Sequence, residues 1–204
     1  MPHVSHVAVI DYDLCRKCPF CVRACPTNAI SWDASGNPVV RVDGSKCLDC
    51  TICMTRCPHH AISMQARDEP LAFGVDWTLA DPEQVTRLCH TAHMHTEQII
   101  CFCRQTAARE VAAAILLGCR TPEQLSVATG IRTGCGVLCI TSVLRLLKAA
   151  GVEGLKAPGW QWYGTYATIW DLPAEAYEKY PEYFLKEDLQ VANELYPRGG
   201  LNDG

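Results

Sequence analysis

The sequence predicts an α+β fold assembled from several small units rather than around one large core. Three observations predict it: short apolar runs alternate with cysteine-rich loops in the first third, helix start and stop signals gather in the middle, and prolines interrupt the remainder. A length of 204 residues permits two or three small domains. We expect domains at 1–64 and 99–151, a linker at 65–98 and an extended tail, without a core of its own, at 152–204.

The composition directs attention to the cysteines. The chain has 14 of them, whereas its 49% apolar and 20% charged residues are ordinary for a soluble protein. The net charge of −4 lacks a basic excess and no apolar run approaches ~18 residues, so we expect neither a nucleic-acid partner nor a membrane span. The N-terminus carries no secretion signal, so we expect a cytoplasmic protein, in which clustered cysteines hold metal more often than they form disulfides.

Eight cysteines form two blocks, each spaced C-x2-C-x2-C-x3-C and followed by a proline. The first block contains Cys15, Cys18, Cys21 and Cys25, and the second contains Cys47, Cys50, Cys53 and Cys57. The second repeats the first at an offset of 32, and Ala29-Ile30-Ser31 recurs at the same offset as Ala61-Ile62-Ser63. The pattern therefore indicates a duplicated unit.

The spacing predicts that the two blocks complete one another's sites. Three cysteines at i, i+3 and i+6 suit a loop that wraps one cluster, while the fourth points away toward another iron centre. One predicted ligand set is Cys15, Cys18, Cys21 and Cys57, and the other is Cys47, Cys50, Cys53 and Cys25. Each half then closes the other's site, so we expect neither half to fold alone.

Residues 1–64 resemble the bacterial-type ferredoxins that bind two 4Fe-4S clusters, because the family's ligand run and trailing proline occur twice. The resemblance implies a pseudo-symmetric two-cluster ferredoxin fold. Apolar runs at 7–10, 30–32, 39–42 and 62–64 fit its short strands. The alternatives are paired zinc sites, which usually use separate CxxC pairs, and a disulfide scaffold, which needs a secretion signal.

The segment 65–98 is expected to be a linker over a surface, with one short helix after Asp81-Pro82. It contains Cys89, His90, His93 and His95, a group that could hold metal. Their spacing matches no site that we can derive, and a solvated linker explains them equally well.

A third cysteine group consists of Cys101, Cys103, Cys135 and Cys139. Between and after the two pairs, the sequence predicts helices at 106–117 and 121–129 and a longer amphipathic helix from about 137 to Gly151. Both pairs are then expected at helix starts, where free N–H groups favour anionic sulfur. Two close pairs suit a 2Fe-2S cluster.

Residues 99–151 resemble the 2Fe-2S domain of bacterioferritin-associated ferredoxin, through Ile-Cys-Phe-Cys at 100–103 and Thr-Gly-Cys-Gly at 133–136. The resemblance implies a small all-α, helix-turn-helix-like domain. The family's second pair is usually C-x2-C, whereas here it is C-x3-C, so Cys139 is the expected fourth ligand with Cys119 or Cys89 as substitutes.

Two other interpretations of this segment compete with a 2Fe-2S site. One is a helix-turn-helix for DNA, but the basic residues do not fall on one recognition helix and the CxC pair would go unexplained. The other is buried structural thiols. Cys119, which follows a predicted glycine cap, is expected to be a small buried apolar residue.

The segment 152–204 holds most of the chain's aromatic residues and is broken by Pro158, Pro173, Pro181 and Pro197. We expect an irregular tail that docks on a partner subunit, with one short helix from Pro173 to Tyr180. The alternative is that the tail packs over the chain's own domains.

The function expected from these features is electron transfer. The sequence has no dinucleotide or phosphate-loop fingerprint, and clusters with four cysteine ligands have no open coordination position for a substrate. We therefore expect a non-catalytic subunit that relays single electrons between a flavin- or metal-containing catalytic oxidoreductase subunit and another redox subunit or soluble carrier. The alternatives are a catalytic subunit whose substrate site forms at an interface, and a redox- or iron-sensing adaptor.

Overall fold

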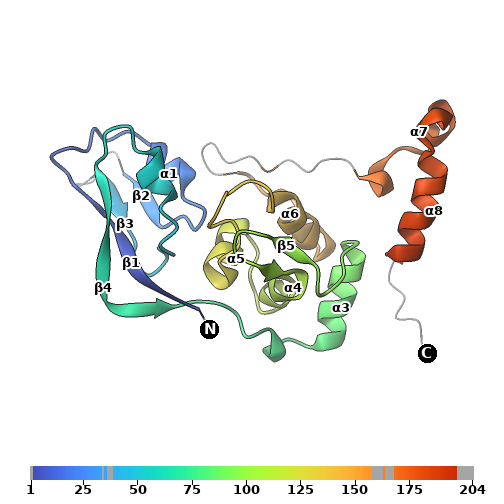
Figure 1. The fold of residues 1–204 in the computed structure, drawn as a ribbon, viewed down its shortest axis with the longest axis horizontal. Coiled ribbons are helices and arrows are strands. Elements are labelled where there is room, and N and C mark those ends of the chain that lie inside the picture. Colours follow the sequence, from blue (N-terminus) through green and yellow to red (C-terminus); the bar gives the residue numbers. More distant parts are fainter. Residues whose placement is uncertain (1, 34, 36–38, 158–162, 164–167, 197–204) are drawn as a thin grey trace.

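The computed structural model describes residues 2–33, 35, 39–157, 163 and 168–196 (Figure 1). It combines short helices with three two-stranded sheets, which confirms the α+β class. Figure 1 shows two bodies side by side, one containing β1–β4 and the other α3–α6, and a pair of C-terminal helices set apart from both. Part of the predicted tail, including Pro158, Pro197 and the aromatic residues Trp160, Trp162 and Tyr166, lies outside the described residues.

The first body contains two antiparallel strand pairs. Strand β1 (His3–Ile10) pairs with β4 (Ile62–Ala72), and β2 (Ile30–Trp32) pairs with β3 (Val40–Val42). The four apolar runs therefore do form strands, although β4 continues well beyond the predicted Met64. Their buried side chains pack with the cysteines in one small core.

The duplication seen in the sequence also appears in the backbone, as two single-turn helices at equivalent positions. Helices α1 (Phe20–Ala24) and α2 (Ile52–Arg56) are separated by the same offset as the cysteine blocks. Left-handed residues recur at that offset as well: Lys17 and Asp49 have φ of 58° and 52°, and Asn28 and His60 have φ of 53° and 50°. The two halves thus bend their chains at equivalent places on either side of the cysteines.

The segment 65–98 is more than a linker. After β4 come a short 3-10 helix, η1 (Trp77–Leu79), and α3 (Pro82–Thr91), whose N-cap Asp81 accepts a hydrogen bond from the Glu83 N–H at 2.9 Å. Val85, Leu88 and Cys89 are buried in the core of the second body. The expectation of a surface path is wrong here because these residues form one apolar stripe on α3.

The second body was expected to be all-helical, but it begins with a small two-stranded ribbon. Its elements are β5 (Ile99–Cys101), β6 (Thr106–Ala107), α4 (Ala108–Leu116), α5 (Pro122–Thr129) and α6 (Ile140–Ala149). Residues 106–107 pair with 99–101, which delays the start of α4. The predicted start of α5 is confirmed: the Thr121 hydroxyl accepts from the Gln124 N–H, and the Gln124 side chain accepts from the Thr121 N–H. Val137, predicted on the apolar stripe of α6, precedes that helix and is exposed.

The two bodies meet at Phe73, just beyond β4. The Phe73 ring is buried with Val4 and Leu48 and lies against Gly130, which ends α5 with φ of 72°. The guanidinium of Arg104 lies over the same ring, 5.4 Å from its centre. Phe73 thus joins the first body to the turn that precedes the Cys135 loop.

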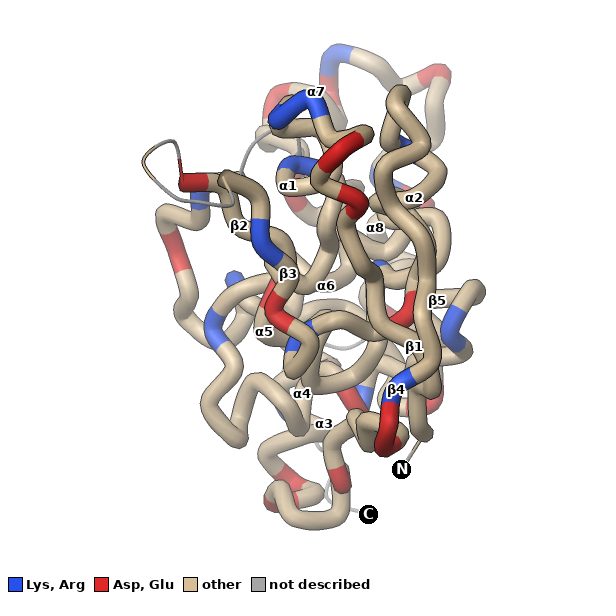
Figure 2. Tube along the Cα trace, turned by 90° about the vertical axis from the view of Figure 1, so that its left-hand side faces the viewer, with Lys and Arg blue, Asp and Glu red and all other residues tan. Residues whose placement is uncertain are grey.

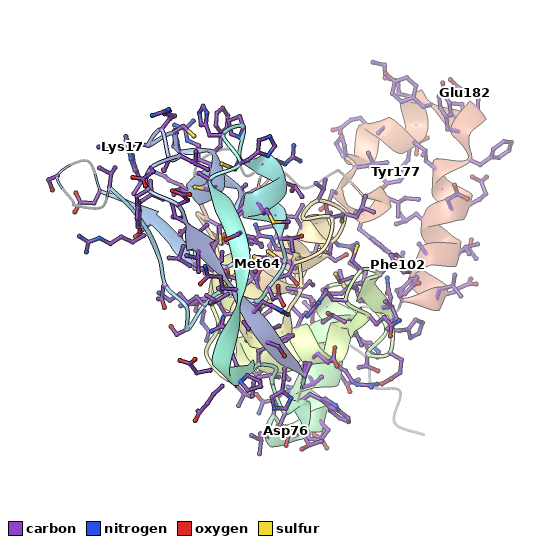
Figure 3. The ribbon with its side chains drawn as sticks, turned by 60° about the vertical axis from the view of Figure 1, so that its left-hand side comes forward. Lys17, Met64, Asp76, Phe102, Tyr177 and Glu182 are labelled. Atoms are coloured by element: carbon purple, nitrogen blue, oxygen red, sulfur yellow. The ribbon has the colours of Figure 1, made fainter. Side chains whose placement is uncertain are left out.

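The tail contains more structure than predicted. Besides η2 (Ile169–Asp171), α7 (Ala174–Lys179) and η3 (Pro181–Tyr183), it forms α8 (Leu185–Leu195), a helix that the sequence reading missed. Figure 1 shows α7 near one end of α8, with both helices apart from the two bodies, and Figure 3 labels Tyr177 and Glu182 in this part of the chain.

Three tail aromatics pack on the chain's own second body. The Trp170 ring stacks on His93 with 3.8 Å between ring centres, Tyr196 lies against His95, and the Tyr163 hydroxyl donates to the Glu123 carboxylate. Packing over the chain's own domain, the alternative to partner docking, is therefore present at these residues. By contrast, Tyr183, Phe184, Val191 and Leu195 are exposed.

Charges of both signs are interspersed over the side of the molecule that Figure 2 shows. Within the described parts of the chain, no helix combines the length and apolar character that crossing a membrane requires.

The contact between Phe73 and Gly130 yields a stability prediction. In Gly130→Ala the new Cβ would lie 2.7 Å from Phe73 Cε2, in addition to the left-handed backbone cost of about 1 to 2 kcal/mol. Gly151→Ala is the matched control, because Gly151 has φ of 76° but nothing within 4 Å of an added Cβ. We expect Gly130→Ala to lower the thermal unfolding midpoint clearly more than Gly151→Ala; equal losses would show that the Phe73 contact contributes nothing.

Candidate metal centres

The structure gathers the cysteines of the first body around two cavities. One cavity is lined by Cys15, Cys18, Cys21 and Cys57, together with apolar residues that include Ile10 and Ile62. The other is lined by Cys25, Cys47, Cys50 and Cys53, together with Ala8, Ile30 and Met64. In each case the last cysteine of one block joins the first three of the other.

Local backbone geometry explains this exchange. Cys25 and Cys57 follow the last turns of α1 and α2 with extended conformations, φ/ψ of −70°/115° and −79°/109°. Each therefore leaves its own helix instead of continuing around it. A backbone N–H donates to each sulfur, from Ala29 to Cys25 Sγ at 3.2 Å and from Ala61 to Cys57 Sγ at 3.4 Å.

Arg67 on β4 positions the start of the second block. Its guanidinium donates to the carbonyl oxygens of Cys47 at 2.7 Å, Gly44 at 2.8 Å and His6 at 3.0 Å. The Ala8 N–H lies 3.5 Å from Cys47 Sγ. The β1–β4 pair therefore fixes where Cys47 enters its cavity.

These cavities suit an iron-sulfur cluster by the chemistry of their donors. Burial raises the pKa of Cys21 and Cys50 to about 11 and that of Cys53 to about 12. Such thiols stay protonated unless a cationic centre binds them, and metal coordination deprotonates a thiol outright. Four thiols around a small apolar cavity, with N–H donors aimed at sulfur, therefore fit a 4Fe-4S cluster.

The third cysteine group lies at one end of the second body. Cys101 ends β5 and is buried, Cys103 lies in the following turn, Cys135 lies in the loop after α5, and Cys139 is the buried N-cap of α6. The thiol of Cys101 is hydrogen-bonded with that of Cys139, and Cys103 with Cys135. The expectation that both pairs begin helices is wrong for Cys101 and Cys103, because the β5–β6 ribbon separates them from α4.

Backbone N–H groups create an anion-stabilising environment at this site. Cys101 accepts from Cys139 and from the N–H groups of Arg132, Arg104 and Cys103, which together lower its pKa to about 6. The N–H groups of Leu138 and Val137 lower the pKa of Cys135. The pKa of Cys139 is raised by its hydrogen bond with the Cys101 thiolate and by burial. N–H groups of the loops, rather than of helix starts as expected, therefore donate to the sulfur atoms. Four thiols in this environment fit a 2Fe-2S cluster.

The remaining candidate ligands have other surroundings. Cys89 is fully buried in the apolar core, and burial raises its pKa to about 12. Cys119 is half-buried and packs against the same core. His93 and His95 contact Trp170 and Tyr196. Among the described residues, no three histidine, cysteine or carboxylate side chains converge on the position of a single metal ion.

Two features of the third site escaped the sequence reading. One is Gly134, whose Cα faces Cys103: an added Cβ would lie 2.3 Å from Cys103 Cβ and 3.0 Å from its Sγ. The other is a rim of exposed apolar side chains, Phe102, Val137 and Leu138, beside the exposed Cys103 and Cys135. The only sequence signal for the close approach of Gly134 to Cys103 was the glycine between Thr133 and Cys135.

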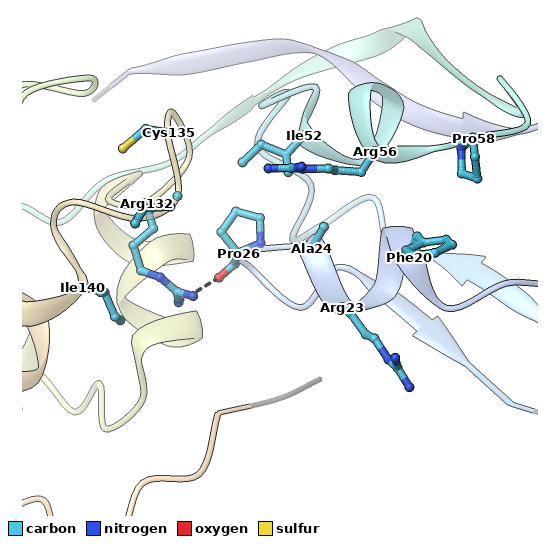
Figure 4. A pocket seen from close by; sticks show the side chains of 12 residues that line it. Phe20, Arg23, Ala24, Pro26, Ile52, Arg56, Pro58, Arg132, Cys135 and Ile140 are labelled. Carbon is cyan, nitrogen blue, oxygen red and sulfur yellow. Dashed lines mark hydrogen bonds between the residues drawn. The ribbon is translucent and has the colours of Figure 1, made fainter. Parts of the chain in front are cut away.

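A cavity of about 560 Å³ separates the first body from the Cys135 loop (Figure 4). Its lining includes Phe20 and Ile52 from the first body and Arg132, Cys135 and Val137 from the second. Figure 4 shows the Arg132 guanidinium reaching across the boundary to the Pro26 carbonyl.

Comparison with known families agrees with this division. A family model described as a 4Fe-4S dicluster domain matches residues 14–61, and one described as a BFD-like 2Fe-2S binding domain matches residues 99–149. The two matches confirm the predicted fusion and its cofactors, two 4Fe-4S clusters and one 2Fe-2S cluster. Comparisons with curated proteins and with solved structures found no match.

The close approach of Gly134 to Cys103 gives a site-specific prediction. Gly134→Ala should displace Cys103 and abolish the 2Fe-2S signal in electron paramagnetic resonance (EPR) spectra, while both 4Fe-4S clusters remain. Gly44→Ala is the control, since its added Cβ would meet only ordinary contacts at 3.6 Å. An intact 2Fe-2S signal in Gly134→Ala would show that the cluster does not depend on the position that Cys103 has beside Gly134.

Proposed function

We propose that this protein is an iron-sulfur electron-transfer subunit that relays single electrons between a catalytic oxidoreductase subunit and another redox subunit or soluble carrier. The observation that carries the proposal is the gathering of twelve thiols into three separate groups of four. The clusters, when bound, accept and release one electron at a time. A cytoplasmic location, which we also propose, would keep these thiols reduced.

We assign each thiol group as one ligand set. Cys15, Cys18, Cys21 and Cys57 would hold one 4Fe-4S cluster, Cys47, Cys50, Cys53 and Cys25 the other, and Cys101, Cys103, Cys135 and Cys139 the 2Fe-2S cluster. Their grouping around separate cavities, the N–H donors to sulfur and the family matches support the assignment. Four cysteine ligands leave no open position on a cluster, which favours electron conduction over substrate chemistry.

The surroundings of the three sites support a relay. The cavities of the first body are lined by apolar residues, whereas Cys103 and Cys135 are exposed beside Phe102, Val137 and Leu138. An exposed apolar rim suits a redox partner that docks close to the 2Fe-2S cluster. The exposed side chains of Val191 and Leu195 on α8 and of its N-cap Phe184 offer a second surface, which we assign to the catalytic subunit, expected to contain flavin or metal.

Iron content tests the cofactor load on which this role depends. Anaerobically prepared protein should contain about ten iron atoms per chain, from two four-iron clusters and one two-iron cluster. Elemental analysis with quantification of acid-labile sulfide provides the measurement. About eight iron atoms without a 2Fe-2S signal would remove the second station of the relay, and zinc in place of iron would refute the role altogether.

Paired substitutions test the crossed ligand sets. Because Cys25 and Cys50 are assigned to one cluster, the double variant Cys25→Ala/Cys50→Ala should lose that cluster alone and retain about six iron atoms. Cys25→Ala/Cys18→Ala should lose both 4Fe-4S clusters and retain about two. Ligation within each block predicts the reverse ranking, because Cys18 and Cys25 would then share a cluster.

A further inference from the structure

Arg132 contacts both bodies of the molecule. Only 2% of its surface is exposed, and it has φ of 71°, in the left-handed region that side chains other than glycine rarely adopt. Strained backbone persists where the surrounding structure over-determines it, and such positions gather at functional sites. The contacts of Arg132 identify what holds it there.

The backbone of Arg132 belongs to the third cysteine site. Its N–H is directed at the sulfur atoms of both Cys101 and Cys139, the buried half of the proposed 2Fe-2S ligand set. The left-handed conformation turns the chain between Gly130, where α5 ends, and the loop that carries Cys135. The position of this peptide therefore depends on where Arg132 is held.

The side chain of Arg132 extends in the opposite direction, to the first body. Its Nη1 donates to the carbonyl oxygen of Pro26 at 3.3 Å, and Pro26 directly follows Cys25, a proposed 4Fe-4S ligand. The charge is balanced by Glu123, whose carboxylate lies 3.2 Å from Nη1, and the guanidinium faces the Tyr163 ring at 5.7 Å. A buried, charge-paired guanidinium is a defined anchor, unlike a flexible surface arginine.

We propose that Arg132 is a positioning residue that fixes the 2Fe-2S centre relative to the 4Fe-4S cluster of Cys25, Cys47, Cys50 and Cys53, and thereby sets the rate of electron transfer between them. This inference rests on the proposed electron-transfer function. Electron transfer between fixed centres falls steeply with distance, so a residue that contacts both the third cysteine site and the chain next to Cys25 influences the rate of the internal step. The cavity beside Arg132 leaves this boundary only partly packed, which increases the importance of each direct link.

The test compares variants of the full-length chain loaded anaerobically with iron and sulfide. Arg132→Asn removes the guanidinium but retains the backbone N–H, and asparagine tolerates the left-handed conformation. Arg132→Asn/Glu123→Gln also removes the carboxylate that the single variant leaves unpaired. Lys148→Asn, at an exposed position on α6, changes the net charge as Arg132→Asn does and is the control for that single variant.

Two measurements report on the geometry between the centres. The first is the magnetic interaction between the reduced 2Fe-2S and 4Fe-4S clusters in EPR spectra, and the second is the rate of electron redistribution after flash photoreduction. Both Arg132 variants should retain all clusters, show a weaker interaction and redistribute electrons several-fold more slowly. Lys148→Asn should match the unmodified protein in both.

Two outcomes would overturn the proposal. One is an unchanged interaction and rate in both Arg132 variants with all clusters present. The other is loss of the 2Fe-2S cluster from both, which would restrict Arg132 to local folding. If instead the unmodified chain held clusters that exchanged no electrons, the proposed function itself would fail, independently of Arg132.

Discussion

Eight cysteines of this chain line two small apolar cavities, and burial raises the pKa of three of their thiols, those of Cys21, Cys50 and Cys53. Burying a free thiolate costs free energy, and this cost disappears once a metal centre neutralises the charge. Cluster binding and folding are therefore coupled. The first body has only a small core around these cysteines and two short strand pairs. Its order therefore depends on sulfur atoms converging from both halves of the duplication.

In the second body, backbone N–H groups of a loop stabilise negative charge on the cysteine sulfur atoms. N–H groups of Arg132, Leu138 and Val137 surround the third cysteine group, and Gly134 leaves room for Cys103. The same loop contacts the first body through Arg132, and Phe73 contacts the adjoining turn at Gly130. Arg132 is thus a residue that both donates to the third cysteine group and joins the two bodies.

Sequence reasoning succeeded where chemistry is local. Thr121 with Gln124 at the start of α5 and Gly130 at its end act within a few residues, and the structure has both as predicted. It failed where tertiary contacts decide. Residues 80–94 pack into the core of the second body through an apolar stripe, which the expectation of a linker did not take into account. The strands β5 and β6 are too short to show periodicity. Arg132 donates to the carbonyl oxygen of Pro26, which lies 106 positions away in the sequence. The tail's α8 was missed because flanking prolines suggested an irregular chain.

An iron-sulfur relay in this chain requires two kinds of cluster to coexist in it. Mössbauer spectroscopy of the anaerobic protein, enriched in the absorbing isotope of iron, tests it most directly because each cluster type gives its own quadrupole doublets. We expect about four-fifths of the iron in 4Fe-4S clusters and about one-fifth in a 2Fe-2S cluster. A spectrum with a single cluster type, or with iron in mononuclear sites, would contradict it.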